Sequence, residues 1–183
     1  MMQTETASDV VPEVSLVASA RSGSDIACDQ LVTRHRARAV RIARSFVRDR
    51  DLAEDIAQEA FVRTFLAIKK LRDPGAFTSY LTRTIVRLSI DHSRKSSSHE
   101  IVSDPDPPPA QPSMSAEESI YIRAILDQLS VKLRTIIVLR DISGMDYAAI
   151  ARTLRIPIGT VRSRLAAARS AFKAAYLSTG EEA

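Results

Sequence analysis

Apolar residues recur every three or four positions along most of the chain, and this spacing predicts helices rather than strands. The clearest helix lies between residues 50 and 70, where Asp51 and Glu54 predict a cap for the first turn. Two further helices are predicted over residues 29–47 and after the turn at 72–76, and no hairpin signal such as Asn-Gly is present. The predicted inward stripes are Ala53, Ile56, Ala57, Ala60, Phe61, Phe65 and Ile68 in the first of these helices, and Phe77, Leu81, Ile85 and Leu88 after the turn.

The second half of the chain has its own series of helix signals. Ser115 and Glu118 have the spacing of a capping box, and the helix after the one that they begin is predicted to end at Gly144. Asp146 then predicts the cap of a short helix, and Pro157 suits the first position of a longer last helix. A short helix, a tight turn and a longer helix together indicate a helix-turn-helix.

A proline-rich, acidic segment at residues 96–119 divides the chain. It contains five of the eight prolines, and because such a composition does not bury a core, it is predicted to be a flexible linker. The predicted fold class is all-α, with two small helical domains, each near the size at which one core is marginally sufficient. The predicted divisions are a disordered acidic tail at 1–14, a first domain at 15–95, a linker at 96–117, a second domain at 118–177 and a tail at 178–183.

Basic charge is concentrated in the two predicted domains. The formal net charge is +4, but residues 1–20 and 96–119 contain three and five acidic residues respectively and no Lys or Arg. Once those eight negative charges are set aside, the remaining segments carry +12. This excess is typical of a surface that contacts nucleic acid, although on charge alone the arginines could equally serve to keep the helices soluble.

The last helix has one apolar face and one small, basic face. The stripe predicted to pack on the preceding short helix is Ile158, Val161, Leu165, Ala168 and Phe172. The outward positions are Arg162, Ser163, Ala166 and Ala167, with Arg164 and Arg169 towards the flanks. Such a face suits the major groove of DNA, where arginine binds guanine and small alanines allow close approach. The alternative is an ordinary surface helix, because arginine and alanine are good helix formers.

Two blocks of the sequence resemble bacterial sigma factors of the extracytoplasmic-function (ECF) group. Residues 126–172, with IPIGTVRSRL as the most specific part, resemble region 4, the promoter-binding domain. Residues 50–95, with AEDIAQEAFVRTF, resemble region 2. The blocks occur in the family's order, and the resemblance extends over roughly 15–177. It implies a subunit that binds the β and β′ subunits of core RNA polymerase and directs the enzyme to promoters without catalysing a reaction itself.

The resemblance also implies roles for particular residues. Region 4 of the family reads the −35 element as duplex DNA, and the positions expected to do so here are Arg140, Arg162 and Ser163, joined on the same helix by Arg164, Ala166 and Ala167. Region 2 engages the −10 element during melting, and a loop ending at Gly75 receives an unstacked base. The residues expected there are Lys69, Lys70, Arg72, Tyr80, Arg83 and Arg87. Tyr80 could stack on a base, but a core position for it is an equal alternative.

A third set of positions is implied for the polymerase itself. The family docks on the clamp helices of the β′ subunit with a polar face that here contains Glu54, Asp55, Gln58 and Glu59. The alternative is that these acids simply favour the helix dipole near the start of the helix. Members of the family are usually held inactive by an anti-sigma factor that packs over regions 2 and 4.

The chain departs from the family pattern at several positions. Family members often have Trp where Tyr80 stands and Asn where Arg87 stands, which affects the base choice expected at the −10 element. Many carry a large or basic residue at the positions of Ala166 and Ala167, so fewer −35 contacts are expected here. Arg155 occupies a turn position that commonly holds glycine, and a positive φ there would cost on the order of 1 kcal/mol.

Enzyme, metal and redox functions have little support in the sequence, and no cofactor, metal or catalytic residue is predicted. Asp55 and Glu59 share a helix face, but no Glu-x-x-His motif is present. His35, His92 and His99 lack the spacing of metal ligands and are predicted to lie on the surface.

The remaining features indicate a cytoplasmic protein, which an anti-sigma factor could hold at the membrane. Cys28 is the single cysteine, so an intramolecular disulfide is excluded, and it is predicted to be a small buried side chain. No secretion leader or membrane-length apolar run is evident. A helix-turn-helix repressor or activator that acts without polymerase is the alternative function. It would need a dimer face, and no heptad seam is present.

Overall fold

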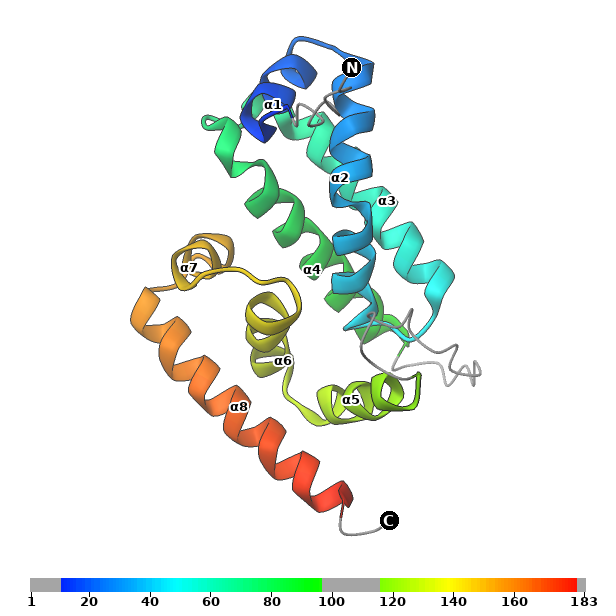
Figure 1. Ribbon diagram of the computed structural model, residues 1–183, viewed down its shortest axis with the longest axis vertical. Helices are drawn as coiled ribbons and strands as arrows, with labels where there is room; N and C mark the ends of the chain where they lie inside the picture. The colour runs from blue at the N-terminus through cyan, green and yellow to red at the C-terminus, as the bar shows by residue number, and fades with distance from the viewer. Residues whose placement is uncertain (1–10, 97–115, 181–183) are drawn as a thin grey trace, which may run out of the picture.

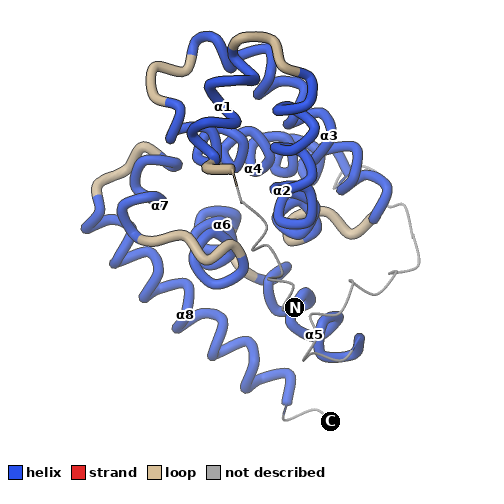
Figure 2. Tube along the Cα trace, turned by 45° about the horizontal axis from the view of Figure 1, so that its top comes forward, coloured by secondary structure: helices blue, strands red, loops and turns tan. Residues whose placement is uncertain are grey.

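The computed structural model describes residues 11–96 and 116–180, and within these ranges the chain forms helices and connecting loops without a strand (Figures 1 and 2). The first bundle comprises α1 (Glu13–Arg21), α2 (Asp25–Arg44), α3 (Arg50–Ala67) and α4 (Phe77–Ser96). The second comprises α5 (Ala116–Gln128), α6 (Val131–Ile137), α7 (Tyr147–Leu154) and α8 (Ile158–Gly180). The predicted all-α class is confirmed. Most of the linker expected at 96–117 lies outside the described residues, as does the Ser115 cap.

The core of the first bundle lies between α2, α3 and α4. Its largest fully buried side chains are Leu31, Ile42, Ile56, Phe77 and Ile85. The apolar stripes predicted for α3 and α4 are confirmed, except that Phe65 is only partly buried. Cys28 was predicted to be buried but is half-buried, and its side chain packs at the margin of the core.

The first turn of α3 is capped by a residue other than the predicted one. Asp49 accepts hydrogen bonds from the backbone N–H groups of Asp51 (2.8 Å) and Leu52 (3.1 Å). Asp51 and Glu54, which were predicted to form the cap, lie inside the helix instead. An N-cap residue needs extended backbone geometry, which Asp49 has, with φ −65° and ψ 128°.

Helix α1 lies partly in a segment that was predicted to be disordered. Residues 13 and 14 of the tail predicted at 1–14 belong to α1, while residues 1–10 lie outside the described ranges. Leu16, Val17 and Ala20 of α1 are buried in the same apolar cluster as the core of the bundle. Burial of these three apolar side chains stabilises α1, although its first residues were predicted to belong to a tail.

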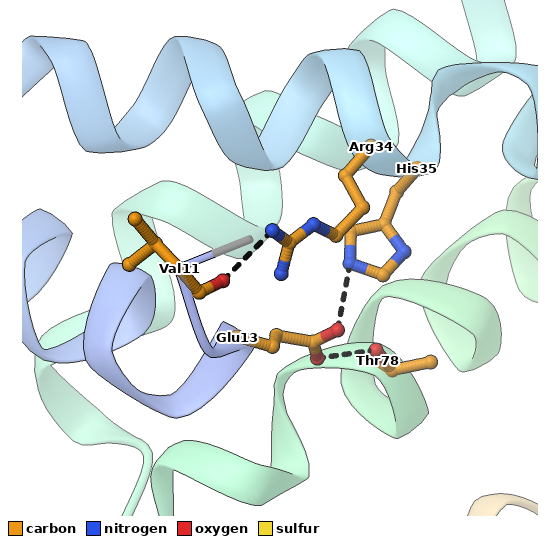
Figure 3. A network of polar contacts seen from close by, with 5 residues as sticks. All are labelled: Val11, Glu13, Arg34, His35 and Thr78. Atoms are coloured by element: carbon orange, nitrogen blue, oxygen red, sulfur yellow. Dashed lines mark hydrogen bonds and ion pairs between the residues drawn. The ribbon is translucent and has the colours of Figure 1, made fainter. Parts of the chain in front are cut away.

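A polar network joins the start of α1 to α2 and α4 (Figure 3). Glu13 accepts a hydrogen bond from the Thr78 hydroxyl (2.7 Å), and its other carboxylate oxygen lies 3.1 Å from His35 Nε2. Arg34 donates to the carbonyl oxygen of Val11 (2.8 Å). The prediction that His35 is a surface residue is therefore wrong: it is only 7% exposed. His92 is half-buried, and His99 lies outside the described residues.

The burial of His35 makes the stability of the fold depend on pH. Burial lowers the pKa of His35 below its ordinary value of 6.5; Glu13 opposes this shift, and Arg38 and Arg34 add to it. The unfolded chain therefore binds a proton at this position more readily than the folded chain. We expect the free energy of unfolding to fall as the pH is lowered through and below 6.5.

Urea unfolding of the wild type, His35→Gln and His92→Gln at about pH 8 and about pH 5.5 measures this dependence. The His35→Gln variant should lose part of the pH dependence, whereas His92→Gln should keep it. An equal pH dependence in the wild type and His35→Gln would show that His35 makes no contribution.

The second bundle contains the predicted helix-turn-helix. Helix α6 continues into a wider π-helical turn at Val138–Ile142, and Gly144 follows with φ +67°, as the predicted left-handed cap requires. Asp146 caps α7 as predicted, by accepting a hydrogen bond from the backbone N–H three residues on (2.6 Å). Pro157 lies one residue before α8 rather than at its first position, and its carbonyl oxygen accepts a hydrogen bond from the helix (3.1 Å).

One residue of the stripe predicted for α8 is not buried. Val161, Leu165 and Ala168 are at most 2% exposed and Phe172 is half-buried, but Ile158 is 44% exposed. Ile158 is the first residue of the helix, so it has helical neighbours on one side only.

The two bundles are in direct contact. Helix α7 lies beside α4, and the π-helical turn contacts α2 (Figures 1 and 2). Buried apolar side chains of both bundles belong to one continuous cluster. Arg48, in the loop between α2 and α3, pairs with Asp127 of α5 (3.2 Å), whose other carboxylate oxygen pairs with Arg134 of α6 (3.0 Å). The contact between the bundles is thus both apolar and ionic.

Candidate nucleic-acid and polymerase interfaces

The outer face of α8 presents the residues predicted to read DNA. Arg162 and Ser163 are exposed, and Ala166 and Ala167 continue the same surface one turn further along. The Ser163 hydroxyl donates to a carbonyl oxygen of the preceding turn (3.2 Å), while its oxygen stays accessible. Arg164 is half-buried on the flank. On this face the exposed guanidinium of Arg162 offers N–H donors, and the side chains of Ala166 and Ala167 are small enough for close approach to base edges.

Two other arginines near this face are engaged within the protein. Arg169 pairs with Asp141 of the π-helical turn (2.7 Å), and this hydrogen bond raises the pKa of Arg169. Arg140 donates to the carbonyl oxygen of Met145 (2.9 Å), and its guanidinium lies 5.2 Å from the ring centroid of Tyr147. The partner of Arg169 could not be expected from helix periodicity, because Asp141 comes from another element. Arg169 thus links α8 to the π-helical turn, and Arg140 links that turn to the loop before α7.

The turn between α7 and α8 contains the one described non-glycine residue with a positive φ. Arg155 has φ +54° and ψ +49°, the left-handed conformation that its position predicted. This conformation lets its N–H bond back to Ala151 and end α7. A side chain at Cβ makes this geometry unfavourable in any residue other than glycine.

We expect Arg155→Gly to raise the free energy of unfolding by about 0.5–1 kcal/mol, because glycine adopts the left-handed conformation without backbone strain. The greater backbone entropy of glycine in the unfolded chain offsets part of this gain. Urea unfolding at neutral pH measures this change. Arg152→Gly, inside α7, is the matched control, and it should lower the stability by about 1 kcal/mol. A loss of stability in Arg155→Gly would mean that its side chain makes contacts worth more than the backbone strain.

The loop between α3 and α4 holds three exposed cations predicted for the −10 element. They are Lys69, Lys70 and Arg72. Asp73 shapes the loop by accepting a hydrogen bond from the Gly75 N–H (2.9 Å) at the start of the short turn Pro74–Ala76. A Cβ on Gly75 would lie 3.3 Å from that carboxylate, so a larger residue there would require the Asp73 side chain to shift by a few tenths of an ångström.

The predicted −10 residues on α4 differ in their surroundings. Arg87 is exposed, and its nearest acidic group is Asp91 at 3.9 Å. Tyr80 is half-buried. Arg83 points at the second bundle, where it donates to the carbonyl oxygens of Thr153 (2.5 Å) and Arg152 (2.6 Å). Sequence periodicity placed Arg83 on the polar side of α4 but gave no signal for this partner.

The predicted polymerase-docking face lies along the outer side of α3. Asp55 and Gln58 are exposed. Glu54 pairs with Arg36 of α2 (3.0 Å), and Glu59 pairs with Arg63 one turn along (2.6 Å). The exposed stripe continues with the apolar side chains of Val62 and Leu66, which are 52% and 78% exposed. The face is thus acidic at one end and apolar at the other.

Within the described ranges, no group of three or more His, Cys, Asp or Glu side chains is arranged to hold a metal ion. None of the helices described there is both long and apolar enough to cross a membrane.

Comparison with known proteins identifies the family. Residues 31–99 match the Sigma-70 region 2 family, and residues 119–172 match the family Sigma-70, region 4. The ECF RNA polymerase sigma factor SigM of Mycobacterium tuberculosis (strain H37Rv) is 32% identical over 171 residues, which cover 92% of this chain and 87% of SigM.

Two solved structures share the fold. CnrH in complex with the cytosolic domain of CnrY matches with a TM-score of 0.73 and 27% identity, over 88% of this chain and 95% of CnrH. A Bartonella quintana sigma factor RpoE in complex with the anti-sigma factor NepR matches with a TM-score of 0.64 and 20% identity, over 80% of this chain and 94% of that one. The chain belongs to the ECF group of RNA polymerase sigma factors.

Proposed function

We propose that this chain binds core RNA polymerase and directs it to promoters through two DNA-reading surfaces, one in each bundle. The outer face of α8 carries the proposal, because Arg162 and Ser163 are exposed on a helix that is packed on its opposite face through Val161, Leu165 and Ala168. In this role the first bundle acts as region 2, the second as region 4, and the segment at 96–117 as the linker. In this role the chain catalyses no reaction itself and acts in the cytoplasm with polymerase.

Region 4 reads the −35 element as duplex DNA. Arg162 binds a guanine edge with two N–H groups, and Ser163 binds a neighbouring base or phosphate. Ala166 and Ala167 form a smooth surface against the groove, and Arg164 contacts a phosphate on the flank. Arg140 and Arg169 support this surface from within, through Met145 and Asp141 respectively.

Region 2 engages the −10 element and the polymerase through different sets of residues. Lys69, Lys70 and Arg72 follow the backbone of the melted strand, and Tyr80, Arg83 and Arg87 continue this surface along α4. The β′ subunit docks on the outer face of α3, with Asp55 and Gln58 making polar contacts beside Val62 and Leu66. Glu54 and Glu59 lie at the edge of this contact, where their ion pairs orient them.

An anti-sigma factor is the proposed regulator. Two of the solved structures that share this fold are complexes with protein partners, the cytosolic domain of CnrY in one and the anti-sigma factor NepR in the other. A partner of this kind would cover the exposed faces of α3 and α4 and so exclude both polymerase and DNA. A membrane-anchored anti-sigma factor would also place the inactive complex at the membrane.

In vitro transcription tests the main proposal. Purified chain added to core polymerase should start transcripts at defined positions on promoter templates, whereas the chain alone should bind promoter duplex weakly. Tight operator binding without polymerase, together with no association with the core enzyme, would instead support a helix-turn-helix repressor or activator.

A charge reversal tests the docking face separately. Asp55→Lys should weaken binding to core polymerase by about fivefold, on the order of 1 kcal/mol, because it removes an exposed polar contact and adds a repelling charge. Asp29→Lys, at another exposed acid, on α2, makes the same charge change elsewhere and should leave core binding unchanged. Equal effects of the two variants in a fluorescence titration with core enzyme would contradict this docking face.

A further inference from the structure

The outer face of α8 continues beyond the residues proposed to reach bases. Arg169 follows Arg162 by seven residues, which is about two helical turns, so both side chains leave nearly the same side of the helix. Both are exposed, and their Cα atoms are separated by about 10 Å along the helix axis. The major groove is about 12 Å wide. A helix that places Arg162 at a base edge therefore brings Arg169 towards the phosphates that border the groove.

An acidic side chain from another element holds Arg169. Asp141, in the π-helical turn, accepts a hydrogen bond from Arg169 Nη2 (2.7 Å). Arg140, the neighbour of Asp141 in the chain, donates instead to the carbonyl oxygen of Met145. The carboxylate of Asp141 is thus paired with the cation of α8 and not with the adjacent arginine.

This ion pair is open to solvent. The side chains of Arg169 and Asp141 are 52% and 41% exposed, whereas those of the pair formed by Arg134 and Asp127 are 11% and 27% exposed. An exposed ion pair contributes little to stability, because hydration and screening by salt offset the attraction. A phosphate group can therefore compete with Asp141 for the guanidinium of Arg169, since both anions accept charge-assisted hydrogen bonds from it.

We propose that Asp141 limits the contact of α8 with DNA by holding Arg169 away from the phosphate backbone. While the pair is closed, Arg169 and Asp141 together add no net charge to this end of the face. Asp141 is thus a positioning residue that acts through Arg169. Phosphate contacts carry no sequence information, so Asp141 sets the affinity and its dependence on salt, and not the choice of base. The inference rests on the proposed role of α8 as a DNA-reading helix.

Duplex binding by the full chain tests whether Arg169 is held back. Fluorescence anisotropy with a short DNA duplex of mixed sequence measures the affinity over a range of salt concentrations. Asp141→Asn should bind about three- to tenfold more tightly than the wild type at low salt. The slope of log affinity against log salt should steepen by about 0.9, the value for one further phosphate contact. An unchanged slope would overturn the proposal.

Two variants that break the same ion pair distinguish this role from a structural one. Arg169→Gln removes the cation and leaves the carboxylate, so it should bind the duplex no more tightly than the wild type. Combining Asp141→Asn with Arg169→Gln should abolish both the gain in affinity and the steeper slope. Asp141→Glu keeps a carboxylate and should resemble the wild type. Equal weakening in the two single variants, or a gain that persists in the combined variant, would contradict the role given to Asp141.

Holoenzyme transcription separates failure of this inference from failure of the proposed function. With core polymerase, Asp141→Asn should keep the wild-type preference among −35 sequences and should remain active at higher salt. Promoter-specific transcription by the wild type, combined with an unchanged salt dependence in Asp141→Asn, would overturn the inference and leave the sigma-factor role intact. Absence of transcription and of core binding in the wild type would contradict the proposed function instead.

Discussion

Replacing Phe77 with alanine is expected to lower the free energy of unfolding by about 3–5 kcal/mol, the range for deleting a fully buried aromatic side chain. Phe77 has no exposed surface, and it lies at the first position of α4. Its ring centroid is 5.7 Å from that of His35 and 6.0 Å from that of Phe65. Removal of the ring would therefore leave a cavity where α2, α3 and α4 meet.

Urea unfolding followed by circular dichroism measures this loss. Leu66→Ala, on α3, is the matched control, because Leu66 is 78% exposed and should change stability by no more than about 0.5 kcal/mol. A loss below about 1.5 kcal/mol in Phe77→Ala would mean that the neighbouring helices collapse into the space. A Phe77→Leu variant should recover part of the stability, since it restores most of the apolar volume.

Arg162→Ala is expected to remove about 1–3 kcal/mol of discrimination at one base pair of the −35 element. The side chain is exposed on the outer face of α8, and the structure gives it no partner within the described part of the chain. Holoenzyme transcription from promoters that differ at single −35 positions measures the effect. Preference should relax at one position and stay unchanged at the others.

Arg162→Lys separates base reading from simple charge. Lysine keeps the positive charge but lacks the planar fork that binds two acceptors of guanine together. It should therefore retain overall binding while losing discrimination at the same base pair. A uniform loss across all sequences in Arg162→Ala, fully restored by lysine, would identify a phosphate contact instead.

The sequence predicted the features that depend on neighbours along the chain. The apolar stripes of α3 and α4, the Asp146 cap and the positive φ of Gly144 follow from periodicity and from the local geometry that each residue type favours. The left-handed Arg155 was anticipated because its position usually holds glycine. The outward orientation of Arg162 and Ser163 follows from the same helical period.

The features that the sequence did not predict depend on residues far apart in the chain. His35 is buried because α1 folds back over it and Glu13 reaches it, and neither event leaves a signal in the sequence around position 35. The partners of Arg83 and Arg169 come from α7 and from the π-helical turn. Helical periodicity identifies a polar face, but it cannot distinguish a side chain that meets solvent from one that meets another helix.

The length of α8 has a mechanical consequence. Its 23 residues make a rod of about 34 Å, whose first half is packed through Leu165 and Ala168. At the far end the Tyr121 hydroxyl of α5 donates to the Tyr176 carbonyl oxygen (2.9 Å), and the two rings meet edge to face. A continuous helix is stiff, so the buried side chains Val161, Leu165 and Ala168 in its first half and the Tyr176 contact near its end together fix the direction of its axis. Without the contact to α5, the second half of α8 would be held from one end only.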